Sequence, residues 1–323
     1  MLLLPSLALA QEAGEATLTL GPGPAENLLA LQLGALGFTD SQSTQISGDI
    51  DVSLEIDPAT GKVLTIEFTD GELSASDVVF SLAFGAATAS TSGIKGTVDT
   101  PGAPGAVDGD TQKFSAAEHR ITFNQGQLMG DALGNSFSTD FSTSPTEWTG
   151  NGDGEVTVTE VSRTATRIIF DVDLALPVID TQTETYDGIE VELTLTGTLT
   201  ASGQVFVYRS AYLQWTEENG IAGAAFTDDF GPGAWTNGLT WAMRSSRVPW
   251  SAASNGALSL DLPAAGTRGA LVLEQSTDLS NWIPALGSQI VGGEIELPAG
   301  STGKIELVSP SVDRYFRVRA IEP

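Results

Sequence analysis

The sequence contains few side chains that could perform chemistry, and its single histidine narrows the options most. His119 lies between Glu118 and Arg120, at the start of a predicted strand. A serine–histidine–aspartate triad would need this residue, yet no G-x-S-x-G motif accompanies it. The chain has no cysteine, and one histidine is too few for a typical zinc site. A lone histidine in a β-protein is usually a surface or loop residue, which is what we expect of His119.

Carboxylates are the remaining source of catalytic groups, because glycoside hydrolases use pairs of them. The pairs Asp171/Asp173 and Glu190/Glu192 alternate with apolar residues, on the side of predicted strands that faces water. With 41 acidic residues in the chain, such pairs arise by chance. No pair stands out, so we predict no catalytic residue and no enzyme activity. A carboxylate-dependent glycan hydrolase is the least favoured alternative.

Two glycine-containing turns carry oxygen donors at alternating positions, as calcium-binding loops do. The candidate Ca²⁺ ligands are Asn151, Asp153 and Glu155 in one turn, and Asp108 and Asp110 in the other. Neither turn has the glycine at the sixth position or the bidentate glutamate of an EF-hand. The alternative is a tight turn with incidental carboxylates. No other cofactor is predicted, because the sequence has neither a P-loop nor a dinucleotide-binding glycine motif.

Two groups of side chains towards the C-terminus could contact partners. Tryptophans crowd into 36 residues and could stack on sugar rings or pack in a core; they are Trp215, Trp235, Trp241 and Trp250. Arginines give the same region a basic character and could direct self-association or docking; they are Arg314, Arg317 and Arg319, with Arg244 and Arg247.

The net charge of −27 is unevenly distributed along the 323 residues. Residues 1–243 hold 7 basic and 33 acidic residues, a net charge of −26, whereas residues 244–323 hold 7 basic and 8 acidic, a net charge of −1. So acidic a chain repels phosphate backbones and anionic lipid surfaces, which makes nucleic acid a poor partner. Self-association, or a cell-surface or glycan partner, is compatible with this charge.

The first ten residues, MLLLPSLALA, resemble the end of a secretory signal peptide, because Ala8-Leu9-Ala10 before Gln11 matches an A-x-A cleavage site. The segment lacks a basic n-region, so the start codon could lie upstream; a buried N-terminal strand is the alternative. No other stretch approaches the ~20 apolar residues of a membrane span. We therefore expect a secreted or cell-surface protein.

The elements that must position these residues are mostly strands. From Ile189 to Leu199 apolar residues alternate with threonine and glutamate, which predicts a strand with one buried face. Ala201-Ser202-Gly203 then predicts a turn into a second strand ending at Tyr208. Residues 50–56 and 64–68 predict a hairpin around the turn 57–62, in which Pro58 presets φ and Gly61 supplies a positive φ.

Other segments predict less regular structure. We expect a short helix at 25–36, a long loop at 85–113 with one short strand near 94–98, an irregular segment at 130–154 and a polar connection at 181–187. Short helices are expected at 212–221 and 235–243.

The fold class that follows is all-β. Residues 25–210 predict a long antiparallel β-sandwich or partly open barrel, because one-sided alternation is typical of antiparallel sheets and helices are too few to cover one. Residues 211–256 are expected to form a helical, tryptophan-rich join, and residues 257–323 a small immunoglobulin-like β-sandwich.

The last third of the chain also resembles a known module. The run from Trp215-x-x-x-Asn219-Gly220-Ile221 through Asn237-Gly238-Leu239, with LEQSTDLSNW at 273–282 and RYFRVRA at 314–320, is similar to the C-terminal region of large exported proteins of environmental bacteria. The resemblance implies an attachment or sorting module. In that family a dockerin-like, aspartate-rich segment implies calcium, but here only the adjacent Asp228 and Asp229 remain, which argues against calcium at this position.

Together these observations predict an exported, non-catalytic bacterial protein with a structural, surface or adhesive role and a C-terminal attachment module. The alternative is a secreted glycan-binding protein that uses exposed aromatic residues. Exposure of the four tryptophans would distinguish the two.

Overall fold

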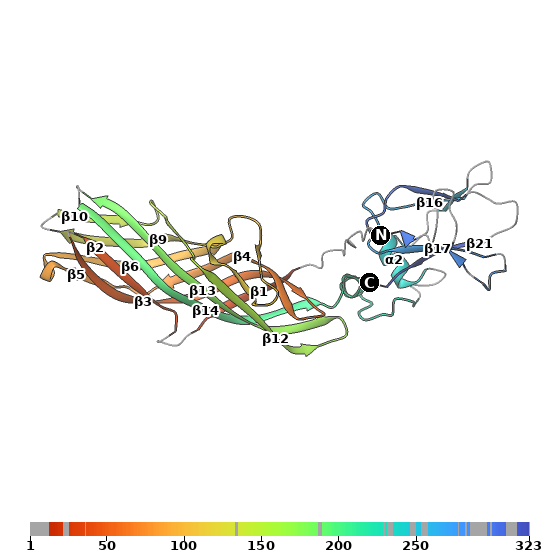
Figure 1. Cartoon of the computed structure of the whole chain (residues 1–323), viewed down its shortest axis with the longest axis horizontal. Helices are drawn as coiled ribbons and strands as arrows, with labels where there is room; N and C mark the ends of the chain where they lie inside the picture. The colour runs from red at the N-terminus through yellow and green to blue at the C-terminus, as the bar shows by residue number, and fades with distance from the viewer. Residues whose placement is uncertain are drawn as a thin grey trace. The chain divides into compact units, whose positions relative to one another are not determined.

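The computed structural model describes residues 13–21, 26–35, 37–132, 135–186, 189–228, 230, 235–245, 250–252, 258–276, 278–281, 283–284, 296–297, 299–307 and 315–322. The chain divides into two compact units (Figure 1). We call Glu12–Val207 the β-body and Tyr208–Pro323 the C-terminal unit. The predicted signal peptide at 1–10 lies outside the described residues.

The β-body consists almost entirely of antiparallel strands. They are β1 (Gly14–Leu20), β2 (Leu28–Ala35), β3 (Phe38–Asp57), β4 (Lys62–Ala75), β5 (Val79–Leu82), β6 (Ala87–Asp99), β7 (Gly105–Ala106), β8 (Lys113–Ser115), β9 (Arg120–Ala132), β10 (Asn135–Asp140), β11 (Thr146–Thr149), β12 (Asp153–Arg163), β13 (Arg167–Tyr186) and β14 (Ile189–Tyr208). Two 3₁₀ turns, at Ala83–Gly85 and Ala116–Glu118, complete it. The all-β prediction is confirmed.

All fourteen strands of the described β-body belong to one sheet, with the main order β10-β9-β6-β4-β3-β1-β14-β13-β12-β8. The sheet curls so that its distant strands meet (Figure 1). Near β11, an isolated bridge between Gly150 and Val178 joins the β9 side to β13. Elsewhere, β7 pairs with β4 while β8 pairs with β12, so the segment 105–115 connects these two strands. One curled sheet, rather than two stacked sheets, therefore encloses the core.

Period-two alternation determines which side chains form that core. In β3, Ile50, Val52 and Leu54 are fully buried, whereas the intervening residues are partly exposed. The predicted hairpin between β3 and β4 is confirmed, with Gly61 at φ 66° and a register shift between Glu55 and Ile56. This bulge turns Val63 inwards and leaves Leu64 41% exposed.

The predicted turn at Ala201-Ser202-Gly203 is wrong, because β14 runs unbroken for 20 residues. Odd-numbered residues are the buried ones before and after this tripeptide, as an uninterrupted strand requires. Small residues are needed here for close approach between strands. A Cβ on Gly203 would lie 2.5 Å from the carbonyl oxygen of Thr17 in β1.

Several segments predicted as helix, loop or connection are strands. The helix expected at 25–36 is β2, in which Leu29, Leu31 and Leu33 are buried with period two. The loop expected at 85–113 contains the 13-residue β6, the segment 130–154 contains β10 and β11, and β13 extends through 181–186. Tertiary pairing stabilises β6, β10 and β11, whose small and polar residues give no strong hydrophobic signal of their own.

A buried asparagine joins β1 and β2, which occupy one strand position between β3 and β14. Asn27, at φ 55°, accepts a hydrogen bond from the backbone N–H of Thr200 through its side-chain oxygen (2.5 Å) and donates to the Thr200 carbonyl (3.0 Å). Its own carbonyl accepts from Ile46 N–H (3.0 Å). One residue thus satisfies backbone groups of both neighbouring strands where the strand position is interrupted.

The C-terminal unit combines two short helices with two small antiparallel sheets. Its elements are α1 (Ala211–Glu218), α2 (Asn237–Met243), β15 (Trp250–Ala252), β16 (Leu258–Asp261), β17 (Leu271–Ser276), β18 (Ile283–Pro284), β19 (Glu296–Leu297), β20 (Lys304–Leu307) and β21 (Tyr315–Ala320). One described sheet has the order β15-β16-β20, and in the other β17 pairs with β18, β19 and β21. Neither described helix is long and apolar enough to cross a membrane.

Both helices share one hydrophobic cluster with these sheets, so the residues expected to form a separate join belong to the C-terminal unit. Helix α1 begins at Ser210, whose hydroxyl accepts from Leu213 N–H, and α2 begins at Thr236 in the same way. The helices predicted at 212–221 and 235–243 are confirmed.

The Gly203→Leu substitution tests whether close strand approach controls the stability of the β-body. A side chain would collide with the backbone of β1, so we expect a loss of about 2–3 kcal/mol in the free energy of unfolding. Urea unfolding followed by circular dichroism measures it. The neighbouring exposed Ser202→Ala should change stability by less than about 0.5 kcal/mol; equal effects would contradict this account.

Candidate functional site

His119 is a core residue, contrary to the expectation of a surface position. It is 1% exposed and its ring stacks on Phe68, with 4.1 Å between ring centroids. Its Nδ1 lies 2.8 Å from the Thr100 hydroxyl, whereas its Nε2 is buried without a hydrogen-bond partner. Burial lowers the pKa of His119 to about 4, so the ring is neutral at pH 7. A general base must be within reach of its substrate, and the ring of His119 is enclosed in the core. Its packing is therefore that of a structural residue.

The carboxylates singled out from the sequence lie on the solvent side, as expected. Asp171, Asp173, Glu190 and Glu192 are all exposed. Asp171 accepts a hydrogen bond from the side chain of Gln204 on β14 (2.8 Å). The described residues contain no group of three acidic or histidine side chains that could hold a metal ion.

One of the two candidate calcium turns is held by its own hydrogen bonds. One carboxylate oxygen of Asp108 accepts from Asp110 N–H (3.0 Å), Thr111 N–H (2.7 Å) and the Thr111 hydroxyl (2.9 Å), which lowers the pKa of Asp108. Lys62 contacts Asp110 (3.2 Å). In the second turn, Asn151 precedes β12, and Asp153 and Glu155 lie at its start; all three are exposed. The Lys113 ammonium lies 3.8 Å from the Asp153 carboxylate.

The tryptophans of the C-terminal unit are mainly core residues. Trp241 is 2% and Trp215 8% exposed, and both lie within 6 Å, centroid to centroid, of the Tyr212 ring. Trp235 is half-buried, and the side chain of Trp250 lies outside the described residues. Buried rings cannot stack on a sugar, so Trp215 and Trp241 do not supply the exposed platform that glycan binding requires.

Of the candidate assembly arginines, Arg317 and Arg319 are exposed on β21, while Arg314 and Arg247 lie outside the described residues. Arg317 donates from Nε to Glu274 on β17 at 2.6 Å, and Arg319 lies 3.8 Å from the same carboxylate. Arg244 ends α2 and donates to the Gly266 carbonyl (3.0 Å).

The residues on which the family resemblance rests make local hydrogen bonds within the C-terminal unit. Asn219 donates to the Trp215 carbonyl at the end of α1 (2.9 Å), and Asn237 donates to Ala225 O (3.0 Å). In the S-T-D-L segment, Asp278 accepts from the backbone N–H of Ser280 and Asn281 (2.8 Å each), which holds the pKa of Asp278 well below its usual range. These motifs therefore specify local geometry.

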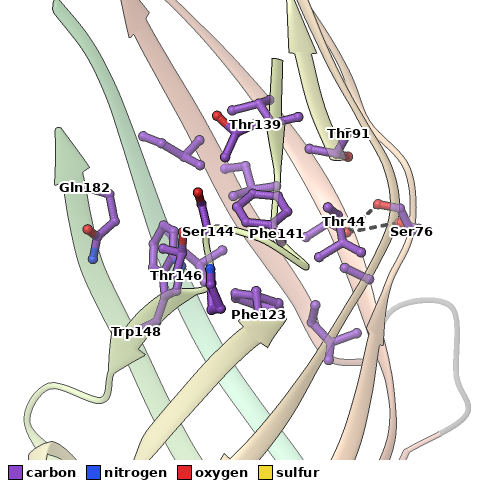
Figure 2. A pocket seen from close by; sticks show the side chains of 18 of the residues that line it. Thr44, Ser76, Thr91, Phe123, Thr139, Phe141, Ser144, Thr146, Trp148 and Gln182 are labelled. Atoms are coloured by element: carbon purple, nitrogen blue, oxygen red, sulfur yellow. Dashed lines mark hydrogen bonds between the residues drawn. The ribbon is translucent and has the colours of Figure 1, made fainter. Parts of the chain in front are cut away.

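A concave site in the described part of the β-body was not predicted. It is a cavity of about 360 Å³ lined by residues of β2, β3, β4, β6, β9, β10, β11, β13 and β14 and of the segments beside them (Figure 2). The aromatic walls are Phe123, Phe141 and Trp148. Phe123 and Trp148 pack edge to face, with 6.2 Å between centroids. Aliphatic side chains from β2, β3 and β14 complete the wall; they are Leu31, Ile46, Val191, Leu193 and Leu195.

Polar groups line the cavity at several places, among them the hydroxyls of Thr91 and Thr139 (Figure 2). On one side the Thr44 hydroxyl donates to the Ser76 carbonyl (2.8 Å). On the other, Ser144, Thr146 and Gln182 lie where the segment after β10 faces β13. The Gln182 amide donates to the Glu147 carbonyl (3.1 Å) and contacts Asp180 (3.2 Å).

Sequence reasoning missed the cavity because its residues come from eight separate segments. The only local signal was the irregular segment 130–154, which supplies Phe141, Ser144 and Trp148. Loops laid across a sheet often hold binding residues.

Comparison with protein-family models, with curated proteins and with solved structures finds no match to this chain.

We expect His119 to make the β-body sensitive to acid. Its pKa is about 4 when folded and near 6.5 when unfolded, so the unfolded state binds more protons between these values. The free energy of unfolding should fall by about 3 kcal/mol as the pH decreases from 6.5 to 4. The difference in stability between wild type and His119→Phe, measured by urea unfolding across this range, should follow this step. A constant difference would contradict it.

Trp241→Ala tests whether the two units have separate cores. Removing this buried ring should destabilise the C-terminal unit by about 3–5 kcal/mol. In thermal unfolding of the full chain, the transition of the C-terminal unit should move down while that of the β-body stays. Trp148→Ala, in the β-body, should give the reciprocal result; a joint shift of both transitions would show a shared core.

Proposed function

We propose that this protein is an exported, non-catalytic surface protein in which the β-body has a structural or adhesive role and the C-terminal unit serves attachment. The observation that carries the proposal is the division into two units with separate hydrophobic clusters and different charge. Residues 12–207 hold 6 basic and 29 acidic residues, a net charge of −23; residues 208–323 hold 8 basic and 12 acidic, a net charge of −4.

The outer surface of the β-body suits such a role. Its longest strands, β3, β13 and β14, each have 20 residues, and their outward positions are rich in threonine, serine and acidic residues. A strongly acidic polar surface stays hydrated and resists unspecific aggregation. The A-x-A motif at 8–10 and the C-terminal resemblance support export and attachment.

Glycan binding and glycan hydrolysis receive less support. The burial of Trp215 and Trp241 removes two of the four rings proposed for a sugar platform. The carboxylate pairs considered for hydrolysis lie on the open outer face of strands.

Of the two exposed arginines on β21, Arg319 offers the cleaner test of whether they direct self-association. Arg317 is hydrogen-bonded to Glu274, whose side chain is only 12% exposed. Reversing the charge of Arg317 would therefore also disturb the fold. We expect light scattering and electron microscopy of residues 11–323 to show ordered assemblies, and Arg319→Glu to reduce them at least severalfold.

The matched control is Lys304→Glu, which makes the same change of charge at an exposed position of β20 in the same unit. It should leave assembly unchanged. A stable monomer with and without Ca²⁺ would refute self-assembly; equal effects of both variants would refute a specific role for Arg319.

A further inference from the structure

The core of the β-body is not filled evenly. Elsewhere in the same sheet, Ile50, Val52, Leu54 and Val172 are fully buried. Around the cavity, Leu31, Ile94, Phe123, Leu128 and Val191 keep 7–8% of their surface exposed. Protein interiors contain few voids larger than a water molecule. At this place large apolar side chains surround an open volume.

The size of this volume matches a small ligand. Ligand sites in proteins are typically clefts of ~300–1,000 Å³, mostly apolar with a few polar groups, and this cavity measures about 360 Å³. With ~30 Å³ for each water-sized group, it has room for roughly a dozen non-hydrogen atoms. Its apolar walls hold water poorly, so displacing that water by hydrocarbon is favourable.

The residues that line the cavity disfavour a charged ligand. Of the 19 described residues around the cavity, none is acidic or basic, although the chain has 41 acidic residues. Two carboxylates lie close to residues of the lining: Asp180 accepts a hydrogen bond from the Gln182 amide (3.2 Å), and Asp140 lies between Thr139 and Phe141 in the sequence. An anionic ligand would lose its hydration without gaining a cation and would be repelled by these acidic groups.

The polar side offers hydrogen-bond acceptors to a ligand. Because the Gln182 amide nitrogen already donates to Glu147 and contacts Asp180, the side chain is oriented and its carbonyl oxygen remains as an acceptor. The hydroxyls of Ser144 and Thr146 lie on the same side (Figure 2). A hydroxyl or amide N–H on the ligand would find its partners here.

We propose that the cavity binds an uncharged, largely hydrocarbon molecule of about a dozen non-hydrogen atoms, with a single hydroxyl or amide group placed beside Gln182. The apolar part occupies the space between Trp148, Phe123 and the leucines of β2 and β14. The proposal is independent of the surface role, because it concerns the interior of the β-body alone.

The test is isothermal titration calorimetry of the full chain with 1-decanol and, separately, with decanoate, which has the same chain length and a charge. Decanol should bind with one site per chain, and decanoate at least tenfold more weakly. Absence of saturable decanol binding would overturn the proposal, and equal affinity for the two would overturn the uncharged class.

Cavity-filling variants locate the site. Ala75→Leu on β4 and Val191→Phe on β14 both add volume to the lining of the cavity, and each should weaken decanol binding at least tenfold while the circular dichroism spectrum stays unchanged. Two variants are used so that one remains informative if the other fails to fold. Val161→Phe, at a position of β12 that is 52% exposed and outside the cavity, is the matched control and should bind as wild type does. Unchanged affinity in both filling variants would place binding elsewhere and overturn the proposal.

Discussion

The burial of one face of a single antiparallel sheet is the constraint on which the β-body depends. With almost no helix to cover it, the sheet has to curl until its inner face covers itself. This explains why its strands alternate so strictly and why the longest of them, β3, β13 and β14, continue for 20 residues. A one-residue slip in any of them would exchange the inner and outer faces. At the bulge at Glu55/Ile56 the register shifts, and pairing between β3 and β4 continues on both sides of it.

The closure of the sheet also explains where the cavity lies. Regular pairing joins the strands around most of the β-body, but the β11 side meets β13 through the isolated bridge between Gly150 and Val178 and through hydrogen bonds of the Asp180 and Gln182 side chains, without a regular strand ladder among the described residues. Beyond that point β10 pairs with β9 alone among the described strands, and the segment 141–146 covers the interior instead of a strand. A loop packs less regularly than a pleated strand, so the core beneath it is less tightly filled.

The sequence was sufficient to predict the fold class, the β3–β4 hairpin and both helices, because each has a strong local pattern. It was insufficient where side chains are small. β6 and the middle of β14 are rich in glycine, alanine, serine and threonine, which are typical of loops, yet they are held in strands by neighbours far away in sequence. His119 shows the same limit: nothing in its sequence neighbours indicates that it stacks on Phe68, about fifty residues earlier. A cavity assembled from eight segments is likewise a property of the closed sheet.

The shared strand position of β1 and β2 makes the β-body a natural scaffold for insertion. Both halves are paired with β3 and β14 independently, and Asn27 satisfies the backbone where the second half begins. Lengthening a connection costs little free energy, since the entropy of loop closure grows only with the logarithm of its length. A guest peptide placed between Gly21 and Asn27 would therefore be displayed from a split strand whose two halves keep their own register, which is a useful property for engineering this fold as a carrier of foreign sequences.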